Sequence, residues 1–323
     1  SYLAMEEINQ NGGIKGKLLE LVVKDDQGIP EKAPIVDREL IEEGIILCVG
    51  HMVSGTGVMG LPVFQEFNKL LISPTMSTES LTGKDDNFIR IIGSNKRQSE
   101  MLSRIALSNK HKGVAVIYEK TNSAYSKEVS QSFIEEYKKS GGKILYKDSF
   151  TSSNTTNFDE IADKITASGA DGVLIVSSGL DLAMLVQKIK HISGSMKIYS
   201  AMWGMTKDAI EKGGKAIEGA YFVGTYDEQN QNPAFLSFKE KYLKAYFSEP
   251  ASPAVYYYET IMMVAEVLKE VKTFSTEEIK KKIIEKKDFK GLQDNFNIDA
   301  FGDTQRGYQL FRVENSVFVR VKE

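Results

Sequence analysis

Cysteine, histidine and proline are scarce in this chain of 323 residues. The single cysteine, Cys48, excludes an internal disulfide and a cysteine-built metal site. The three histidines, His51, His111 and His191, have neither the spacing of a metal-ligand pair nor an evident nucleophile partner. Only seven prolines, with hydrophobic residues at 41%, exclude a disordered or collagen-like chain. These scarcities predict a globular protein without metal or hydrolase chemistry.

Long apolar runs and an excess of charge of one sign are also lacking. No stretch approaches the roughly 18 apolar residues that a membrane span needs, and no signal-like pattern begins at Ser1. A trimmed, mature form of an exported protein would look the same. Lys and Arg number 41 against 44 Asp and Glu, for a net charge of −3. We therefore expect neither nucleic acid nor an anionic membrane as a partner.

Short apolar segments alternate with amphipathic ones through most of the chain. Continuously apolar strands are typical of a parallel sheet covered by helices on both faces, and the alternation predicts an α/β fold built of βαβ units. Residues 32–43 and 125–140 are interpreted as crossover helices. The predicted strands are 18–24, 45–49, 70–73, 88–92, 114–118, 143–150, 172–176, 197–200 and 220–224.

The pattern changes after about Glu228, where helices follow one another with little strand between them. The last of these helices opens with a capping box of Ser275 and Glu278. A hairpin is predicted to close the chain. The chain begins within a helix, so the first strand of the α/β pattern is missing from it. The segments concerned are the helices 1–9, 233–246, 255–271 and 277–286 and the hairpin strands 308–313 and 317–321.

Residues 55–60 spell G-x-G-x-x-G between a strand and a helix. In a dinucleotide-binding site the first glycine follows the strand directly, and an acidic residue ends the next strand. Here residues 50–54 intervene, and Glu79 lies well past the next strand. We interpret the segment as a small-residue loop at a helix N-terminus, where Ser54 and Thr56 add hydroxyl donors for an anion. A nicotinamide-dependent oxidoreductase is the weakest of the alternatives.

Five loops rich in hydroxyl groups and glycine each follow the carboxyl end of a predicted strand. Any one of them could be turn or capping chemistry. Together they predict a crevice with neutral hydrogen-bond donors and aromatic surface but no obvious nucleophile or general base. Binding without catalysis, cofactor or metal therefore fits best. The loops are 54–57, 73–78, 122–126, 177–179 and 201–204.

Three further groups of polar residues can be interpreted from their positions in the sequence. The pair Asp25 and Asp26 is interpreted as turn-forming or capping, because neighbours on a strand point to opposite faces. His111 and His191 stand among lysines and are predicted to lie on the surface. His51 follows a strand at the end where α/β ligands bind, so both a structural and a functional role stay open for it.

Several segments resemble one known family, in order along most of the chain. They include 9–27 (NQNGGIKGKLLELVVKDDQ), 44–54 (GIILCVGHMVS), 72–77 (ISPTMS), 88–90, 171–173, 217–219, 238–246 and Tyr258. The chain resembles the type I periplasmic, or extracellular, solute-binding proteins of ABC transporters, in the branched-chain amino-acid (Leu/Ile/Val) class. The order and spacing of many motifs, and no single one, carry the resemblance.

The resemblance implies two doubly wound, Rossmann-like α/β lobes joined by three hinge crossovers, with the ligand in the cleft between them. The N-terminal lobe would comprise residues 1–94 plus 228–304, and the C-terminal lobe residues 95–227 plus 305–323. Closure by hinge bending would then enclose the ligand.

The resemblance also implies a set of ligand-binding residues. From the first lobe these are Ser54, the backbone of Met76, and Ser77, all suited to a carboxylate. From the second lobe they are Tyr125, Ser177, Ser178, Met202 and Trp203. A second set of candidates comprises His51, Thr75, Asp181 and Asp227.

Met202 departs from the family pattern. Amino-acid binders of the family place a carboxylate there, against the ligand's ammonium group. Either Asp181 or Asp227 reaches that group here, or the ligand has no ammonium. Trp203 could supply a cation–π face worth roughly 0.5–2 kcal/mol.

The function that the resemblance implies is capture of a small carboxylate-bearing ligand, an amino acid of the branched-chain or apolar type, and its delivery to the permease of an ABC importer. The expected protein is a monomer without enzymatic activity. It would be periplasmic or extracellular after removal of a signal peptide, with any lipid anchor outside this chain. Two alternatives stay open: a ligand-binding sensory domain of a receptor, and a binder of aliphatic or aromatic carboxylates that lack an amine.

Overall fold

The computed structural model describes residues 1–322, and the chain in it divides into two compact units. Unit 1 comprises Ser1–Ser94 and Asn230–Arg306. Unit 2 comprises Asn95–Gln229 and the chain from Gly307 onward. The chain therefore passes from one unit to the other three times. Glu323, the end of the predicted C-terminal lobe, lies outside the described residues.

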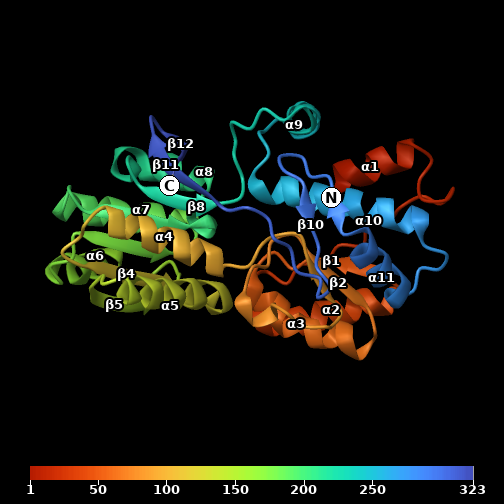
Figure 1. The fold of residues 1–323 in the computed structure, drawn as a ribbon, viewed down its shortest axis with the longest axis horizontal. Helices are drawn as coiled ribbons and strands as arrows, with labels where there is room; N and C mark the ends of the chain where they lie inside the picture. The colour runs from red at the N-terminus through yellow and green to blue at the C-terminus, as the bar shows by residue number, and fades with distance from the viewer. Residues whose placement is uncertain (323) are drawn as a thin grey trace. The chain divides into compact units, whose positions relative to one another are not determined.

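Unit 1 contains a parallel three-stranded sheet in the order β1-β2-β3. Its apolar core joins this sheet to helix α3 through Phe64, Leu71, Met76 and Phe88. In Figure 1 the late helices, coloured cyan to blue, lie in the same unit as the red and orange N-terminal elements. The elements are α1 (Tyr2–Gln10), η1 (Pro30–Lys32), α2 (Ala33–Glu42), β1 (Leu47–Val49), α3 (Ser54–Glu66), β2 (Leu70–Ser73), η2 (Glu79–Leu81), β3 (Phe88–Arg90), α9 (Pro233–Tyr246), α10 (Ser252–Glu270), α11 (Thr276–Lys286), β9 (Asp288–Phe289) and β10 (Phe296–Asn297).

The strand predicted over residues 18–24 is wrong. The backbone there is irregular and pairs with no strand of the described chain. Leu18 is 74% exposed and Val23 is 63% exposed, so their apolar side chains gain little by burial. A strand needs a neighbour that takes up its N–H and C=O groups, and the sequence pattern does not report whether that neighbour is there.

Unit 2 is built on a seven-stranded sheet in the order β12-β11-β8-β7-β6-β4-β5. From β5 to β8 all neighbours are parallel, and β11 and β12 complete the edge with antiparallel pairs. The elements are α4 (Lys96–Ser108), β4 (Val114–Glu119), α5 (Ser123–Lys139), β5 (Ile144–Phe150), α6 (Phe158–Ala167), β6 (Gly172–Val176), α7 (Gly179–Ile192), β7 (Lys197–Ala201), η3 (Met202–Gly204), α8 (Lys207–Gly213), η4 (Gly214–Ile217), β8 (Tyr221–Gly224), β11 (Gln309–Glu314) and β12 (Val317–Val321).

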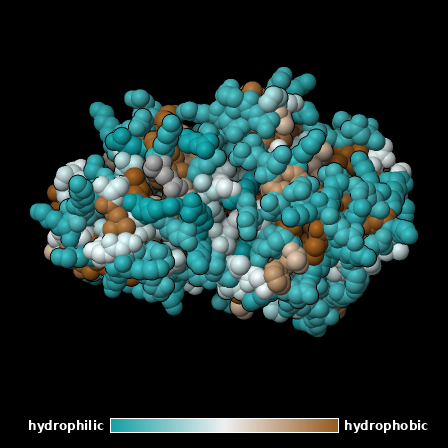
Figure 2. Space-filling model, in the orientation of Figure 1, coloured by the Kyte–Doolittle hydropathy of each residue, from teal (hydrophilic) through white to brown (hydrophobic). Residues whose placement is uncertain are grey.

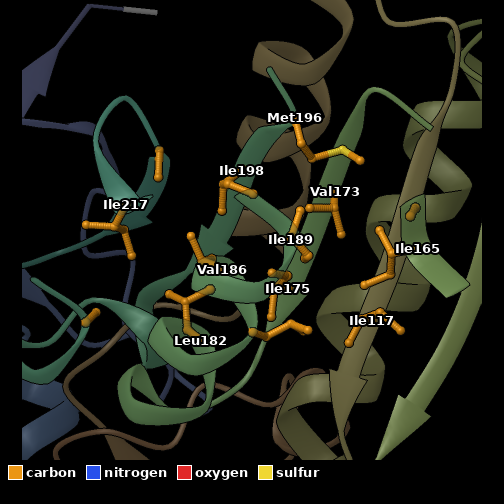
Figure 3. Packing of buried hydrophobic residues seen from close by; sticks show 14 of the residues in the cluster. Ile117, Ile165, Val173, Ile175, Leu182, Val186, Ile189, Met196, Ile198 and Ile217 are labelled. Atoms are coloured by element: carbon orange, nitrogen blue, oxygen red, sulfur yellow. The ribbon is translucent and has the colours of Figure 1, made fainter. Parts of the chain in front are cut away.

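Helices cover both faces of the unit 2 sheet. One core packs α6, α7 and α8 against the strands, as in Figure 3, where Val186 and Ile189 of α7 lie among Ile175 and Ile198 of the sheet. The other core packs α4 and α5 on the opposite face, with Leu102, Phe133 and other side chains fully buried. This doubly wound arrangement confirms the predicted α/β class.

The strand order of unit 2 reverses between β4 and β6, because β4 connects to β5 on one side of it and β6 lies on the other. Ligands of open α/β sheets bind at such a point, outside the carboxyl ends of the strands. The loops that follow β4 and β6 are two of the five that the sequence singled out. The fold therefore places these loops at the end of the sheet where binding is favoured.

Two local predictions in the second half of the chain, the N-cap of α11 and the closing hairpin, are confirmed. The Ser275 hydroxyl accepts the N–H of Glu278 at 3.3 Å and caps α11. Asn315 and Ser316, with φ of 53° and 62°, form the two-residue turn of the predicted hairpin.

Hydrophilic side chains dominate the face drawn in Figure 2, and apolar ones occur there in separate small patches. Among residues 1–322, no helix combines the length and the apolar character needed to cross a membrane.

Candidate functional site

Two loops of unit 1 carry its candidate residues, and hydroxyl groups tie them together. One loop follows β1 and the other follows β2. The Ser73 hydroxyl donates to the carbonyl oxygen of His51 at 3.2 Å. The Thr75 hydroxyl lies 2.7 Å from the carbonyl oxygen of Met52 and 3.3 Å from that of His51. Thr75 is thus a link between the two loops.

Ser54 is the first residue of α3 and is 3% exposed. The residue before it, Val53, caps the helix without any side-chain hydrogen bond. Amide groups in the first turn of a helix carry partial positive charge and favour an anion. Ser54 therefore lies where a carboxylate would be stabilised.

Ser77 and Met76 are both fully buried in the loop after β2. The Ser77 hydroxyl has no hydrogen-bond partner among the described residues. A buried hydroxyl without a partner costs free energy, so such a group in a candidate binding loop is suited to a ligand. The N–H of Met76, the backbone group that could donate to a carboxylate, already donates to the Ser73 hydroxyl at 3.0 Å.

The glycine motif lies inside α3 and is not a loop, which corrects the sequence interpretation. Its glycines serve close packing. A Cβ on Gly57 would overlap the Met76 side chain, and one on Gly60 would lie 2.6 Å from His51 Nε2 and overlap Asp37. The absence of side chains lets α3 approach Met76, His51 and α2 closely.

His51 is 8% exposed and lies between two carboxylates. Its Nδ1 is 2.7 Å from Asp26 Oδ2, and its Nε2 is 3.1 Å from Asp37 Oδ2. Burial alone would lower the pKa of His51, but the hydrogen bonds and charges of Asp37 and then Asp26 outweigh it and raise that pKa above its usual value. Both ring nitrogens are therefore engaged within unit 1.

The acidic pair that precedes α2 forms turns, as predicted. Asp25 accepts the N–H of Gln27 and Asp26 accepts that of Gly28, each at 2.8 Å. Burial would raise the pKa of Asp26, but the hydrogen bond from His51 and other contacts hold it below its usual value. The bond to His51 is a second role of Asp26 that the sequence did not indicate.

His111 was predicted on the surface, and that prediction is wrong. Its side chain is 3% exposed and bonds to Asp171 at 3.1 Å and to the Tyr199 hydroxyl at 2.6 Å. Burial lowers the pKa of His111 despite the nearby Asp171. The lysines near it in sequence misled the prediction, because the side chain turns inward beneath β6. His191 is exposed, as expected.

In unit 2, Tyr125, Met202 and Trp203 meet around the buried side chain of Gln98. The Tyr125 hydroxyl donates to Gln98 Oε1 at 2.9 Å, and the N–H of Met202 donates to the same oxygen at 3.1 Å. The ring of Trp203 packs edge-on against that of Tyr125, with centroids 6.2 Å apart. Tyr125 is 4% exposed, whereas Met202 and Trp203 are half-buried. The structure thus brings three predicted residues together.

Ser177 and Ser178 lie in the loop after β6. The Ser178 hydroxyl accepts the N–H of Asp181 at 3.2 Å and so caps α7. The carboxylate of Asp181 also accepts the hydroxyls of Ser178, at 3.0 Å, and of Ser152, at 2.9 Å. Burial raises the pKa of Asp181. The Ser177 hydroxyl donates to the carbonyl oxygen of Ser178 at 3.1 Å.

Asp227 lies near the end of the first long segment of unit 2, where one carboxylate oxygen accepts the N–H of Gln229 at 2.9 Å. This contact orders the chain just before it enters unit 1 for the second time.

Two residues that sequence reasoning missed organise the unit 2 loops. Gln98 also donates to the Tyr308 hydroxyl at 3.1 Å, so one amide holds three segments. Glu119 at the end of β4 is fully buried and accepts the N–H groups of Thr121 and Ser152. No motif marks either residue. Their only signal is a polar side chain at a position that the amphipathic or apolar pattern assigns to the interior.

Among residues 1–322, no group of three or more histidine, cysteine, aspartate or glutamate side chains could hold a metal ion.

An α/β chain of two units, with buried hydroxyl groups in the loops after its strands, is typical of proteins that bind small solutes. The chain belongs to the periplasmic binding protein family, whose model matches residues 2–317.

Relatives in sequence and in structure agree with this membership. A Leu/Ile/Val-binding protein homolog of Brucella melitensis is 29% identical over 234 residues, which cover 72% of this chain and 62% of the relative's length. A leucine-binding protein, LivK, of Thermotoga maritima has a TM-score of 0.90 at 21% identity, and the match covers 99% of this chain and 92% of that one.

Two solved structures with bound ligands share the fold. The branched-chain amino-acid transporter substrate-binding protein LivJ of Streptococcus pneumoniae, in complex with isoleucine, has a TM-score of 0.87 at 22% identity and covers 99% of this chain and 92% of its own. A solute-binding protein of an ABC transporter from R. palustris, in complex with benzoate, has a TM-score of 0.84 at 16% identity, with 98% and 89% covered.

Proposed function

We propose that this protein binds a small carboxylate-bearing solute, an apolar amino acid of the branched-chain type, and delivers it to an ABC importer. The ligand would lie between the two units, and closure of the units would enclose it. The relatives named above support the ligand class, since one is a leucine-binding protein, one is named a Leu/Ile/Val-binding protein homolog, and one solved structure holds isoleucine. The same proposal implies that the protein works outside the cytoplasm.

The observation that carries the proposal is the buried, unpartnered hydroxyl of Ser77, in a loop that hydroxyl groups tie to the segment leading into α3, whose first residue is the buried Ser54. A carboxylate would accept the Ser77 hydroxyl and lie near the partial positive charge of the first helical turn. In unit 2, Tyr125 would support Trp203 as a cover for the apolar part of the ligand. Ser177 and the Met202 side chain would complete that wall.

A second candidate ligand class, carboxylates without an amine, is favoured by the surroundings of Met202. Asp181, one candidate partner for an ammonium group, already accepts two hydroxyls within unit 2. Asp227 accepts the N–H of Gln229, so both candidate carboxylates already have partners within unit 2. The structural neighbour with bound benzoate shows that the fold accepts such a ligand.

The test is a thermal-shift screen of the chain after it has been unfolded, dialysed and refolded to remove any carried-over ligand. The panel comprises the twenty amino acids, benzoate and a series of aliphatic carboxylates. A ligand at 100 times its Kd stabilises the folded state by about 2.7 kcal/mol, which shifts Tm by several degrees.

Each outcome selects one ligand class. A shift with leucine, isoleucine or valine supports the amino-acid binder. A shift with carboxylates alone supports the second class. No shift across the panel, in a protein whose circular dichroism shows that it has refolded, contradicts both.

A further inference from the structure

The two hydrogen bonds of the His51 ring depend on whether the ring is protonated. A neutral imidazole carries one N–H, so it can donate only one hydrogen bond. In unit 1 both ring nitrogens face carboxylate oxygens, Asp26 at 2.7 Å and Asp37 at 3.1 Å. Only the imidazolium form donates to both. In the neutral form one nitrogen lone pair would face a carboxylate in a buried site, which is repulsive.

The backbone of the same residue holds the two binding loops of unit 1. The carbonyl oxygen of His51 accepts the hydroxyls of Ser73 and Thr75. Ser54 follows three residues later and begins α3. Loss of the hydrogen bond to either carboxylate would remove an anchor that holds His51 to Asp26 or Asp37. The loop that bears Ser54 would then be held less firmly, and so would its ties to the loop that bears Ser77.

From this geometry we infer that His51 is a positioning residue: as an imidazolium bonded to Asp26 and Asp37, it holds the ligand-binding loops of unit 1, so that ligand affinity follows its charge. This inference rests on the proposed function only in taking Ser54 and Ser77 as ligand contacts. It gives His51 a role other than direct ligand contact, since both ring nitrogens are occupied.

The other titratable groups around His51 do not change charge in the working range. Burial, and then the charge of Asp37, raises the pKa of the Cys48 thiol on β1. Burial also raises the pKa of the Tyr257 phenol on α10, with smaller contributions from Cys48 and Asp26. On the α3 side the ring meets Gly60 and Phe64, which carry no charge. The transition therefore belongs to His51 and its two carboxylates.

The direction of the effect follows from the raised pKa of His51. The stabilisation of the unit 1 loops by protonated His51 is fully present below about pH 6.5, the usual pKa of histidine. It is lost as pH rises through the higher pKa of His51 in the folded protein. Asp26, whose pKa is lowered, stays charged until strongly acidic pH. Ligand affinity should thus fall on the alkaline side and be unchanged through mildly acidic pH.

The experiment follows the ring protons of the three histidines by NMR as pH is raised in the ligand-free protein, together with the amide of Ser54. A His51→Gln variant identifies the His51 signal, and exposed His191 is the internal control. We expect His51 to titrate above pH 6.5 and the Ser54 amide to shift with the same midpoint. In an Asp37→Asn variant both midpoints should fall by about one pH unit or more.

A second arm measures the Kd of L-leucine across the same pH range. We expect Kd to rise about tenfold or more as pH passes the His51 midpoint. In Asp37→Asn this rise should move to lower pH, whereas a rise caused by titration of the leucine amine would stay at the same pH. A His51 midpoint at or below 6.5, or a Ser54 amide that ignores it, overturns the inference. If leucine fails to bind while the His51 ring protons and the Ser54 amide titrate together, the proposed ligand is wrong, but the role of His51 in holding the loop is supported.

Discussion

Buried polar side chains without a motif do much of the organising in this protein. Ser77 is buried and unpartnered, Gln98 holds three segments with one amide, and His51 lies between two carboxylates. Each is a site where the loss of a single polar atom should be measurable. The costs of leaving such atoms unsatisfied exceed those of exposed groups because water cannot replace the missing partner.

Replacing Ser77 with alanine should weaken binding of the ligand found in the thermal-shift screen. A hydrogen bond to a charged carboxylate is worth about 1.5–3 kcal/mol, so Kd should rise roughly 10- to 150-fold while Tm without ligand stays within a degree or two or rises. Isothermal titration gives the Kd. Ser80→Ala, an exposed serine in the same segment, is the matched control. Equal affinities for the two variants would remove Ser77 from the site.

A Gln98→Leu variant should lower the stability of the protein itself. The change leaves the Tyr125 hydroxyl and the Met202 N–H without their shared acceptor, at a cost of about 2–4 kcal/mol in the free energy of unfolding. Urea denaturation measures this. Gln131→Leu, at an exposed glutamine of α5, should change the free energy by about 0.5 kcal/mol or less. A similar small change in Gln98→Leu would show that its hydrogen bonds are dispensable.

At the scale of elements, strongly patterned segments were predictable. Strands β2, β6 and β12 and helix α9 have the predicted bounds, because turn residues or a proline mark their ends. The strand expected over 18–24 failed, since pairing depends on a neighbour far away in sequence. The prediction of a loop at the glycine motif was also wrong. Six residues with three glycines can form part of a helix when close packing stabilises that helix.

The candidate site was predictable to a lesser degree. Loops after strands can be found from sequence, and the structure brings Tyr125, Met202 and Trp203 together as such loops suggest. The residues that hold these loops, Gln98 and Glu119, could not be found. Their hydrogen bonds join segments up to about two hundred residues apart, and no spacing in the chain records such a contact.

The N-cap of α11 offers a test of local stability. Ser275→Ala removes the acceptor for the N–H of Glu278 and should lower the free energy of unfolding by about 1 kcal/mol. The shift is measured by urea denaturation at neutral pH. Ser140→Ala, at the C-terminal end of α5, where no capping hydroxyl bond is made, should have little effect. Equal losses in both variants would contradict a capping role.

At the scale of the whole molecule, the proposed ligand site takes residues from both units. Ligand binding should therefore slow amide hydrogen exchange in the loops after β1 and β2 of unit 1 and also in residues 122–126 and 201–204 of unit 2. Exchange measured by mass spectrometry, with and without the ligand from the screen, tests this. Strand β5, at the far edge of the unit 2 sheet, is the internal reference. Protection confined to one unit would contradict a ligand held between the two.

The three passages between the units have a consequence for synthesis on the ribosome. Unit 1 lacks α9, α10 and α11 until residue 286 has been made, and unit 2 lacks β11 and β12 until residue 321 has been made. Neither unit is one continuous piece of chain, so each must wait for a segment that is made after part of the other unit. The early α/β segments of both units must wait with apolar faces exposed, which makes a nascent chain of this protein a natural client for a chaperone.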